Sequence, residues 1–295
     1  MSPDFFIVDV FAERAYAGNP LAVVLGAERL DDDSMQLVAA ETNYSETTFV
    51  YSDPEANGGF RTRLFTPARE IAFAGHPILG TAWVIAKHLA ATATNLIKVN
   101  LQVGAIPVHF EPSAQGGDSL WFDAPPITPG IQCDRARMAL ALGLATDDID
   151  PRYPVQVMAA GTAAVIVPLR SLAAVQRALL DLKTYSRLMA EGFPPLTYLF
   201  CAETRHSGND LSARFFFEAH GVREDPATGN GAAFLASYLR MHGVYPPDKR
   251  TWRIEQGHEV RRPSLVQIRF GAATDSKIQV GGGVVAAIQG NLIRA

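Results

Sequence analysis

Hydrophobic and polar residues alternate along much of this chain, and longer apolar runs with helical spacing interrupt the alternation. The alternation predicts strands in the first half at residues 5–11, 21–25, 47–51, 60–65, 96–103, 106–111 and 120–122. Apolar residues at helical spacing predict helices at residues 31–41 and 78–90. Pro107 predicts that the strand at 106–111 lies at a sheet edge, because proline cannot donate a hydrogen bond to a strand ladder.

The second half of the chain mixes strands and helices in the same way. Strands are predicted at residues 155–158, 163–167, 198–200, 212–218, 252–255, 265–270, 277–280 and 284–289. Helices are predicted at residues 134–144 and 171–182, and in a run that ends at Met241. The triplet from Gly281 to Gly283 is typical of a turn. Strands outnumber helices and each half holds one strong apolar helix, so the sequence predicts an α+β fold with each sheet wrapped round or covering a helix.

One stretch organises the first half. The strand at 60–65 and the helix at 78–90 are joined by a loop that ends in Gly75 and His76. The backbone N–H groups there would lie at the helix N-terminus, where unpaired donors and the helix dipole favour an anion. Pro77 fits the first turn of the helix, where a missing N–H costs nothing. The alternative is an ordinary strand-to-helix turn.

The same order of strand, acidic residue, small residue, glycine and helix recurs later in the chain. Superposing the two stretches aligns Glu70 with Glu224, Gly75 with Gly229 and His76 with Asn230. So long a separation indicates two similar halves and not a solenoid of short repeats. We therefore predict an N-terminal half at residues 1–118, which also takes the C-terminal strand 285–295, and a C-terminal half at residues 119–284.

Composition narrows the function classes. The chain has 295 residues, of which 48% are hydrophobic and 19% are charged, which is enough for two medium domains with cores. Its net charge of -4 gives no electrostatic reason to expect binding to nucleic acid or to an anionic membrane. No apolar run approaches the roughly 18 residues that span a bilayer, and the N-terminus lacks the basic start of a signal peptide. We expect a cytoplasmic protein.

Cysteine and histidine usage bears on cofactors. Cys133 and Cys201 lie far apart and outside any motif, which is typical of reduced thiols in the cytoplasm. The histidines are scattered without ligand spacing, and the chain has no glycine-rich nucleotide loop. We therefore expect no metal and no other cofactor.

Three residues could carry proton transfer, which needs a carboxylate or imidazole held in a cleft with its pKa moved toward working pH. Glu46 opens an apolar strand beside Ser45, which can hydrogen-bond it. His76 lies at the predicted helix N-terminus, whose positive end would lower its pKa and favour the neutral ring. Asp225 precedes Pro226 just before the second central helix. Their structural alternatives are a surface glutamate at a strand end, a satisfied loop histidine and a helix N-cap.

Ser45 and His76 do not indicate a serine hydrolase. The chain has no Gly-x-Ser-x-Gly sequence, and Ser45 precedes a strand, whereas a nucleophilic serine of that kind sits in a strand-to-helix elbow.

Five motifs, in order, carry a resemblance to a known family. They are Gly18-Asn19-Pro20, the stretch Asn43 to Phe49, the stretch Phe65 to Pro67 with Phe73 to Thr81, the stretch Glu224 to Gly229, and Gln256-Gly257. This set resembles the PhzF-like family of phenazine biosynthesis over almost the whole chain. The resemblance implies the fold of diaminopimelate epimerase: two pseudo-symmetric α+β halves, each a sheet curled round a central helix, with the active site between them.

The resemblance also implies roles for individual residues. The family's proton-transferring glutamate falls on Glu46, and its assisting histidine and aspartate fall on His76 and Asp225. Residues that hold substrate through backbone and side-chain donors fall on Ser45, Gly75, Gly229 and Asn230. The implied activity is that of a cofactor-independent isomerase, a homodimer, acting on a small cyclic or unsaturated amino-acid-like carboxylate. The best-known member isomerises trans-2,3-dihydro-3-hydroxyanthranilate.

Two departures from the family pattern leave the substrate open. Members active on that anthranilate derivative tend to carry serine where this chain has Asn230, and a smaller aliphatic residue is usual where it has Tyr44. One rival function is an amino-acid racemase or epimerase of the same fold. Its two thiols would fall on Ala74 and Thr228, neither of which can act as a thiolate base. The other rival is a non-catalytic small-molecule binding protein that kept the fold.

Overall fold

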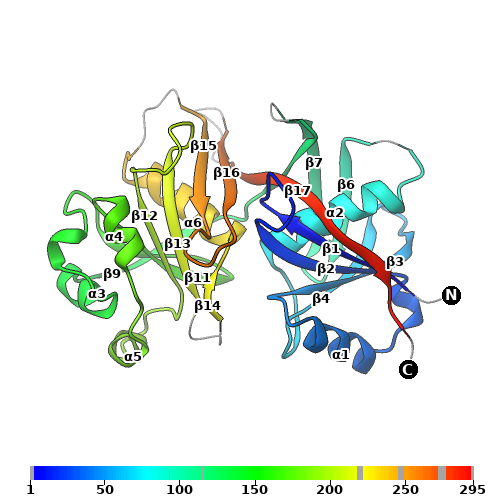
Figure 1. Ribbon diagram of the computed structural model, residues 1–295, viewed down its shortest axis with the longest axis horizontal. Helices are drawn as coiled ribbons and strands as arrows, with labels where there is room; N and C mark the ends of the chain where they lie inside the picture. Colours follow the sequence, from blue (N-terminus) through cyan, green and yellow to red (C-terminus); the bar gives the residue numbers. More distant parts are fainter. Residues whose placement is uncertain are drawn as a thin grey trace. The chain divides into compact units, whose positions relative to one another are not determined.

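The computed structural model describes residues 3–92, 94–113, 116–217, 222–244, 249–271 and 277–293. The chain divides into two compact units (Figure 1). Unit 1 comprises residues 1–122 and 281–295, and unit 2 comprises residues 123–280. Among the described residues, no helix is long and apolar enough to cross a membrane.

Unit 1 is a sheet closed into a barrel. Its strands are β1 (Asp4–Val10), β2 (Asn19–Leu25), β3 (Thr47–Pro54), β4 (Phe60–Phe65), β5 (Glu70–Ile71), β6 (Leu96–Leu101), β7 (Gly104–Pro112), β8 (Asp118–Asp123) and β17 (Ile278–Asn291). β1 pairs antiparallel with β2 and β17, β2 runs parallel to β3, and β4 runs antiparallel to β3 and parallel to β6. β6, β7 and β8 continue antiparallel, and β8 pairs with β17, which closes the ring.

The helix α2 (Gly75–His88) forms the centre of unit 1. It packs against β1, β2, β3, β6 and β7, and its residues from Gly75 to Ala82 are all buried. Gly80 allows the close approach, because a Cβ there would lie 2.6 Å from Leu21 Cδ2 and 2.9 Å from Val10 Cγ2. A second helix, α1 (Asp32–Thr42), packs on the outside against β3 and β4.

Unit 2 is built in the same way around α6 (Gly229–Met241), which packs against β10, β11 and β16. Its strands are β9 (Thr128–Cys133), β10 (Val155–Ala160), β11 (Thr162–Pro168), β12 (Thr197–Cys201), β13 (Leu211–Phe217), β14 (Val222–Asp225), β15 (Thr251–Gln256) and β16 (Ser264–Phe270). Three shorter helices enclose a second apolar cluster beside the sheet: α3 (Arg135–Ala141), α4 (Leu172–Arg177) and α5 (Leu182–Ala190).

The two units repeat one topology. The parallel pair β2–β3 corresponds to β11–β12, the antiparallel pair β4–β5 to β13–β14, and the parallel pair β4–β6 to β13–β15. In chain order, α2 lies between β5 and β6, and α6 lies between β14 and β15. The predicted α+β fold of two similar halves, each a sheet around a helix, is therefore confirmed.

The repeat extends to side chains. In unit 1, Arg63 on β4 donates to Glu70 on β5 from Nε at 2.9 Å and from Nη2 at 2.8 Å. In unit 2, Arg214 on β13 donates to Glu224 on β14 from the same two atoms, at 3.1 and 2.7 Å. Each guanidinium also lies over the phenylalanine ring two residues further along its strand. These bidentate pairs anchor the short strand that precedes each central helix.

The single helix predicted at residues 171–182 is wrong, because α4 and α5 are separate helices. Arg214 Nη1 donates to the backbone oxygens of Val175 at 2.9 Å and Ala178 at 2.7 Å, so a strand side chain binds the last carbonyls of α4. Asp181 then caps α5 by accepting from the backbone N–H of Lys183.

Two other predictions about strands also fail. The Gly281–Gly283 triplet is not a turn, because β17 runs straight through it, and a Cβ on Gly281 would lie 2.5 Å from the Leu120 oxygen. The glycines allow close approach of neighbouring backbone. β7 is not an edge strand, since β6 and β8 flank it, although its pairing with β8 begins only at Val108, after Pro107.

Candidate active site

Glu46 lies in the short loop between α1 and β3. The helix ends at Thr42, and Asn43 follows it in the left-handed conformation with φ 53°, which turns the chain back. Thr42 Oγ1 and Thr47 Oγ1 are 2.9 Å apart, so the two ends of the loop are tied together. The Glu46 side chain is 15% exposed, so it is largely removed from water while remaining accessible.

His76 is the second residue of α2, and not part of a loop before the helix as predicted. Its side chain is 5% exposed, and burial lowers its pKa from 6.5 to about 3. The ring is therefore neutral at physiological pH, as the sequence predicts, although burial is the main cause. The hydroxyl of Thr81 donates to that of Thr48 at 2.9 Å, which ties α2 to β3 and holds His76 near the Glu46 loop.

The ring of His76 is oriented by Asn19 at the start of β2. The Asn19 amide nitrogen lies 3.3 Å from His76 Nδ1. Because an amide nitrogen can only donate, Nδ1 accepts and the ring proton sits on Nε2. Nε2 lies 3.5 Å from Glu46 Oε2, so the histidine presents an N–H donor to the carboxyl group. A neutral donor beside a partly exposed carboxyl is an arrangement suited to general acid–base chemistry.

Asp225 lies at the end of β14, just before α6, and is buried. The hydroxyl of Thr228, the N-cap residue of α6, donates to Asp225 Oδ2. Gln256 Nε2 donates to the backbone oxygen of Asp225 at 2.9 Å. Gly257 brings the next loop close, because a Cβ there would lie 2.5 Å from the Pro226 oxygen. The aspartate is therefore held by its own loop and by the end of β15.

The two central helices differ from the shorter helices at their N-termini. Each of α1, α3, α4 and α5 starts after a residue whose side chain accepts from a first-turn N–H: Asp31, Asp134, Ser171 and Asp181. In the described chain, α2 starts after Ala74 and α6 after Thr228, and neither side chain caps its helix. The N-cap side chains of α2 and α6 therefore do not bond the first-turn N–H groups, which lie at the positive end of each helix dipole.

The structure places the predicted residues in two groups, one in each unit. In unit 1, Glu46 and His76 lie in contact, Ser45 is next to Glu46 and half-buried, and Gly75 is the buried first residue of α2. In unit 2, Asp225 is joined by Gly229, the buried first residue of α6, and by half-buried Asn230.

Sequence reasoning gave no role to three residues that contact these groups. They are Asn19, Thr228 and Gln256. All three stand in motifs that carry the family resemblance, which is the only signal for them in the sequence.

The two cysteines are buried in unit 2 and are not disulfide-bonded. Burial raises the pKa of both Cys133 and Cys201 to about 11, so neither is a thiolate at neutral pH. Within the described residues, no cluster of three or more His, Cys, Asp or Glu side chains could hold a metal ion.

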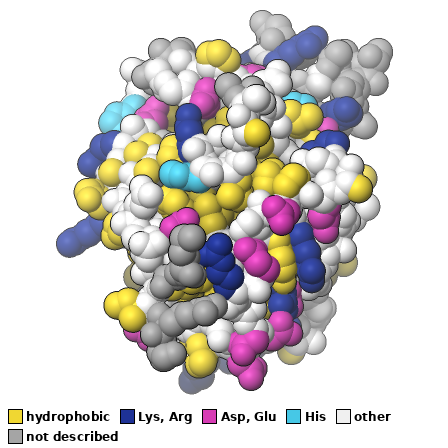
Figure 2. Space-filling model, turned by 90° about the vertical axis from the view of Figure 1, so that its right-hand side faces the viewer, with side chains coloured by type: hydrophobic (Ala, Val, Ile, Leu, Met, Phe, Trp, Pro, Cys, Tyr) yellow, Lys and Arg dark blue, Asp and Glu magenta, His cyan; other side chains and the backbone are white. Residues whose placement is uncertain are grey.

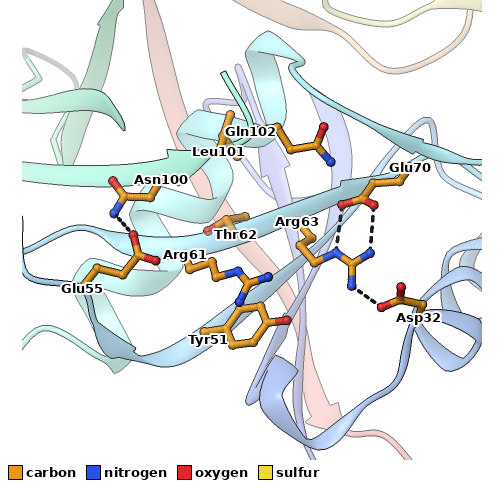
Figure 3. Close-up of a pocket in the computed structure, with 10 residues that line it drawn as sticks. All are labelled: Asp32, Tyr51, Glu55, Arg61, Thr62, Arg63, Glu70, Asn100, Leu101 and Gln102. Atoms are coloured by element: carbon orange, nitrogen blue, oxygen red, sulfur yellow. Dashed lines mark hydrogen bonds and ion pairs between the residues drawn. The ribbon is translucent and has the colours of Figure 1, made fainter. Parts of the chain in front are cut away.

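A surface pocket of about 530 Å³ lies on unit 1, and none of the candidate catalytic or substrate-binding residues lines it (Figure 3). Figure 3 shows Arg63 between Asp32 and Glu70, with which it forms ion pairs. Arg61 lies 4.4 Å over the ring of Tyr51. On the face that Figure 2 presents, acidic and basic side chains likewise stand side by side. The pocket is therefore lined by ion-paired surface side chains, and it is not the candidate site.

Three comparisons connect this arrangement to known proteins. The model of the PhzC-PhzF family, described as phenazine biosynthesis-like protein, matches residues 8–290. The trans-2,3-dihydro-3-hydroxyanthranilate isomerase of Pseudomonas aeruginosa is 34% identical over 97% of this chain and 98% of its own length. Two relatives at similar identity, from Mesorhizobium japonicum (33% identical over 98% of both chains) and Pasteurella multocida (32% identical over 98% of this chain and 93% of its own length), are named only as uncharacterized isomerases.

Solved structures show the same fold. A PhzF-family protein of Bacillus anthracis superposes with a TM-score of 0.87 over 100% of both chains, at 23% sequence identity. A probable proline racemase of Agrobacterium radiobacter superposes with a TM-score of 0.64 at 9% identity, covering 99% of this chain and 93% of that one. This chain therefore shares its fold with a PhzF-family protein and with a probable proline racemase.

Proposed function

This chain belongs to the phenazine biosynthesis-like family and is an isomerase, and we propose that it moves a proton between two carbons of a small cyclic or unsaturated amino-acid-like carboxylate. Glu46 is the proton carrier in this proposal, and no cofactor takes part. Its contact with His76, at 3.5 Å between Oε2 and Nε2, is the single observation that carries the proposal.

The reaction balances without a co-reactant. Glu46 begins protonated and gives its proton to one carbon of the unsaturated substrate, which forms a C–H bond as the electrons of a double bond shift. The resulting carboxylate takes a proton from a second carbon, which breaks a C–H bond and restores the double bond elsewhere. Substrate and product then contain the same atoms, and Glu46 returns to its starting state.

His76 assists as a hydrogen-bond donor. Because its pKa lies at about 3, it cannot supply a proton as an imidazolium at neutral pH. Its Nε2–H faces Glu46 Oε2 and stabilises the carboxylate in the interval between the two proton transfers. The 3.5 Å separation is long for a hydrogen bond, and such contacts tighten when substrate binds.

The remaining predicted residues hold the substrate. Its carboxylate would bind backbone N–H groups at a central helix N-terminus, where no side-chain cap competes within the described chain. Gly75 and Gly229 are the first residues of those helices. Ser45 and Asn230 would donate to further oxygens, and Asp225 would bind the substrate's amino or hydroxyl group and balance its charge.

The test is an isomerase assay with two matched variants. The compound is trans-2,3-dihydro-3-hydroxyanthranilate, the substrate in the name of the Pseudomonas aeruginosa relative, and the signal is loss of its diene absorbance. Glu46→Gln keeps the shape and removes the titrating group, so we expect a loss of about 10²- to 10⁴-fold in turnover. Glu41→Gln, a change at an exposed glutamate nearby, serves as the control and should leave turnover unchanged.

The outcomes separate the alternatives. Equal turnover by wild type and Glu46→Gln would remove Glu46 from the mechanism. If the wild type leaves this compound unchanged, related cyclic and unsaturated amino-acid-like carboxylates are screened in the same assay. Binding of such compounds without turnover of any of them would favour the non-catalytic binding protein.

A further inference from the structure

A chain of hydrogen bonds runs through unit 2 and ends on the Asp225 carboxylate. The Tyr198 hydroxyl on β12 lies 3.2 Å from Gln256 Oε1 at the end of β15. Gln256 Nε2 lies 2.9 Å from the Asp225 backbone oxygen and 3.4 Å from Thr228 Oγ1. The Thr228 hydroxyl donates to Asp225 Oδ2. All four residues are buried.

The direction of every donor in this chain is fixed. A backbone carbonyl can only accept, so the Asp225 oxygen sets the orientation of the Gln256 amide, with Nε2 toward it. Gln256 Oε1 must then accept from the Tyr198 hydroxyl. Thr228 donates to the carboxylate and can accept from Gln256. The donors therefore point one way, from Tyr198 toward Asp225, and bonds aligned in this manner polarise and strengthen one another.

The surrounding sequence makes room for the chain of bonds. Gly231, in the first turn of α6, leaves space for the tyrosine ring, because a Cβ there would lie 2.6 Å from Tyr198 Cδ2. On the other side the ring contacts Phe215, with 5.6 Å between ring centroids. Burial raises the pKa of Tyr198, so its hydroxyl keeps its proton and remains a donor throughout the accessible pH range.

We propose that Tyr198 and Gln256 are positioning residues for the isomerase reaction, and that they act by fixing the orientation of Asp225. The inference rests on the function proposed above, in which Asp225 binds a polar group of the substrate. Neither positioning residue needs to touch the substrate, because Gln256 fixes the Asp225 backbone and Thr228 fixes its carboxylate.

Two tyrosines of unit 2 provide a matched pair of variants. Tyr198→Phe removes only the hydroxyl at the start of the hydrogen-bond chain and keeps the ring in its packing. Tyr238→Phe removes the hydroxyl of another fully buried tyrosine in the same unit, which donates to the Pro154 oxygen at 2.7 Å and is not part of this series of hydrogen bonds. Both variants should lower the melting temperature to a similar extent, so that stability loss is matched. Gln256→Met, which keeps the side-chain length without polar groups, is the second test variant.

A double-mutant cycle shows whether Tyr198 acts through Asp225. We expect Tyr198→Phe and Gln256→Met to lower kcat/KM by about tenfold, as loss of one buried bond in a cooperative network does, and Tyr238→Phe to stay within about twofold of wild type. In an Asp225→Asn background, Tyr198→Phe should have no further effect, because the group it positions is already gone. A full additional loss there, or an equal loss in Tyr238→Phe, would overturn the proposal.

Hydrogen exchange decides the matter even without turnover. The backbone amides of Asp225, Ala227, Thr228 and Gly229 should exchange faster in Tyr198→Phe and Gln256→Met than in wild type, and their exchange should be unchanged in Tyr238→Phe. Unchanged exchange in the two test variants refutes the positioning role, whatever the substrate. If Glu46→Gln abolishes turnover while Tyr198→Phe matches Tyr238→Phe in every assay, the proposed function stands and this inference falls.

Discussion

Replacing Arg214 with methionine tests whether the arginine–glutamate pair contributes more to the free energy of unfolding in unit 2 than its counterpart does in unit 1. The side chains of Arg214 and Glu224 are 6% and 4% exposed, whereas those of Arg63 and Glu70 are 16% and 25% exposed. Removing Arg214 leaves the Glu224 carboxylate buried without the cation that pairs with it, while Glu259, whose Oε2 lies 3.9 Å from Arg214 Nε, adds a second negative charge nearby.

The expected magnitudes follow from burial. Removing one partner of a buried ion pair costs about 3–5 kcal/mol, because an uncompensated charge remains in the protein. Arg214→Met also removes the donor that binds the Val175 and Ala178 oxygens, which places it at the upper end of that range. Arg63→Met leaves Glu70 in partial contact with water, so we expect a cost of only about 1–2 kcal/mol.

The cost should also depend on pH. Burial already raises the pKa of Glu224 with Arg214 present, and the pKa rises further once the arginine is gone. The folded variant then binds a proton more tightly than the unfolded chain, so its stability falls as pH rises above the ordinary carboxyl value and recovers as pH falls. Replacing Glu224 as well, in Arg214→Met/Glu224→Leu, removes the buried charge and should restore much of the lost stability.

Urea unfolding at pH 5, 7 and 8 measures these free energies, with circular dichroism as the probe and wild type, both single variants and the double variant compared. Equal costs for Arg214→Met and Arg63→Met would refute the argument from burial. A cost of Arg214→Met that stays constant from pH 5 to 8 would refute the argument from the Glu224 charge.

Three further predictions follow from the burial and contacts of individual side chains. His76→Asn should flatten the pH dependence of the unfolding free energy between pH values of about 6.5 and 3. In that range only the unfolded wild type binds a proton on this residue, and urea titrations at several pH values measure the difference. Cys133 and Cys201 should react slowly with iodoacetamide at pH 7 until urea unfolds the protein, since burial raises both pKa values to about 11. Mass spectrometry follows the modification, and rapid modification of the folded protein would contradict this prediction. Asn19→Ala should lower kcat/KM about five- to tenfold through loss of the bond that orients the His76 ring, and an unchanged kcat/KM would disprove that role.

The strands and central helices of the fold were predictable because their signals are local. Alternation located β4 at its observed bounds, and the apolar run after Pro77 located the body of α2. The short strands β5, β9 and β14 went unpredicted, since β5 has two residues and β9 is almost entirely exposed. The break between α4 and α5 depends on Arg214, which comes from a distant strand and leaves no trace in the helix sequence.

The candidate site was predictable as a set of residues and not as an arrangement. Glu46 and His76 stand out beside a strand start and a helix start, and the family resemblance assigns them roles. Their 3.5 Å contact depends on α2 packing inside the barrel beside β3, which no local pattern encodes. The roles of Asn19 and Gln256 depend in the same way on strand pairing, because each reaches its partner from a separate strand.

The most direct test of the central claim is the fate of the transferred proton. Wild-type protein and Glu46→Gln are incubated in deuterated water with trans-2,3-dihydro-3-hydroxyanthranilate, or with the compound that the screen identifies, and the product is analysed by NMR. We predict that wild type forms product with deuterium at the newly protonated carbon and that Glu46→Gln forms it at least about 10²-fold more slowly. Product formation at the wild-type rate by Glu46→Gln, with the same deuterium content, would contradict the assignment of Glu46 as the proton carrier.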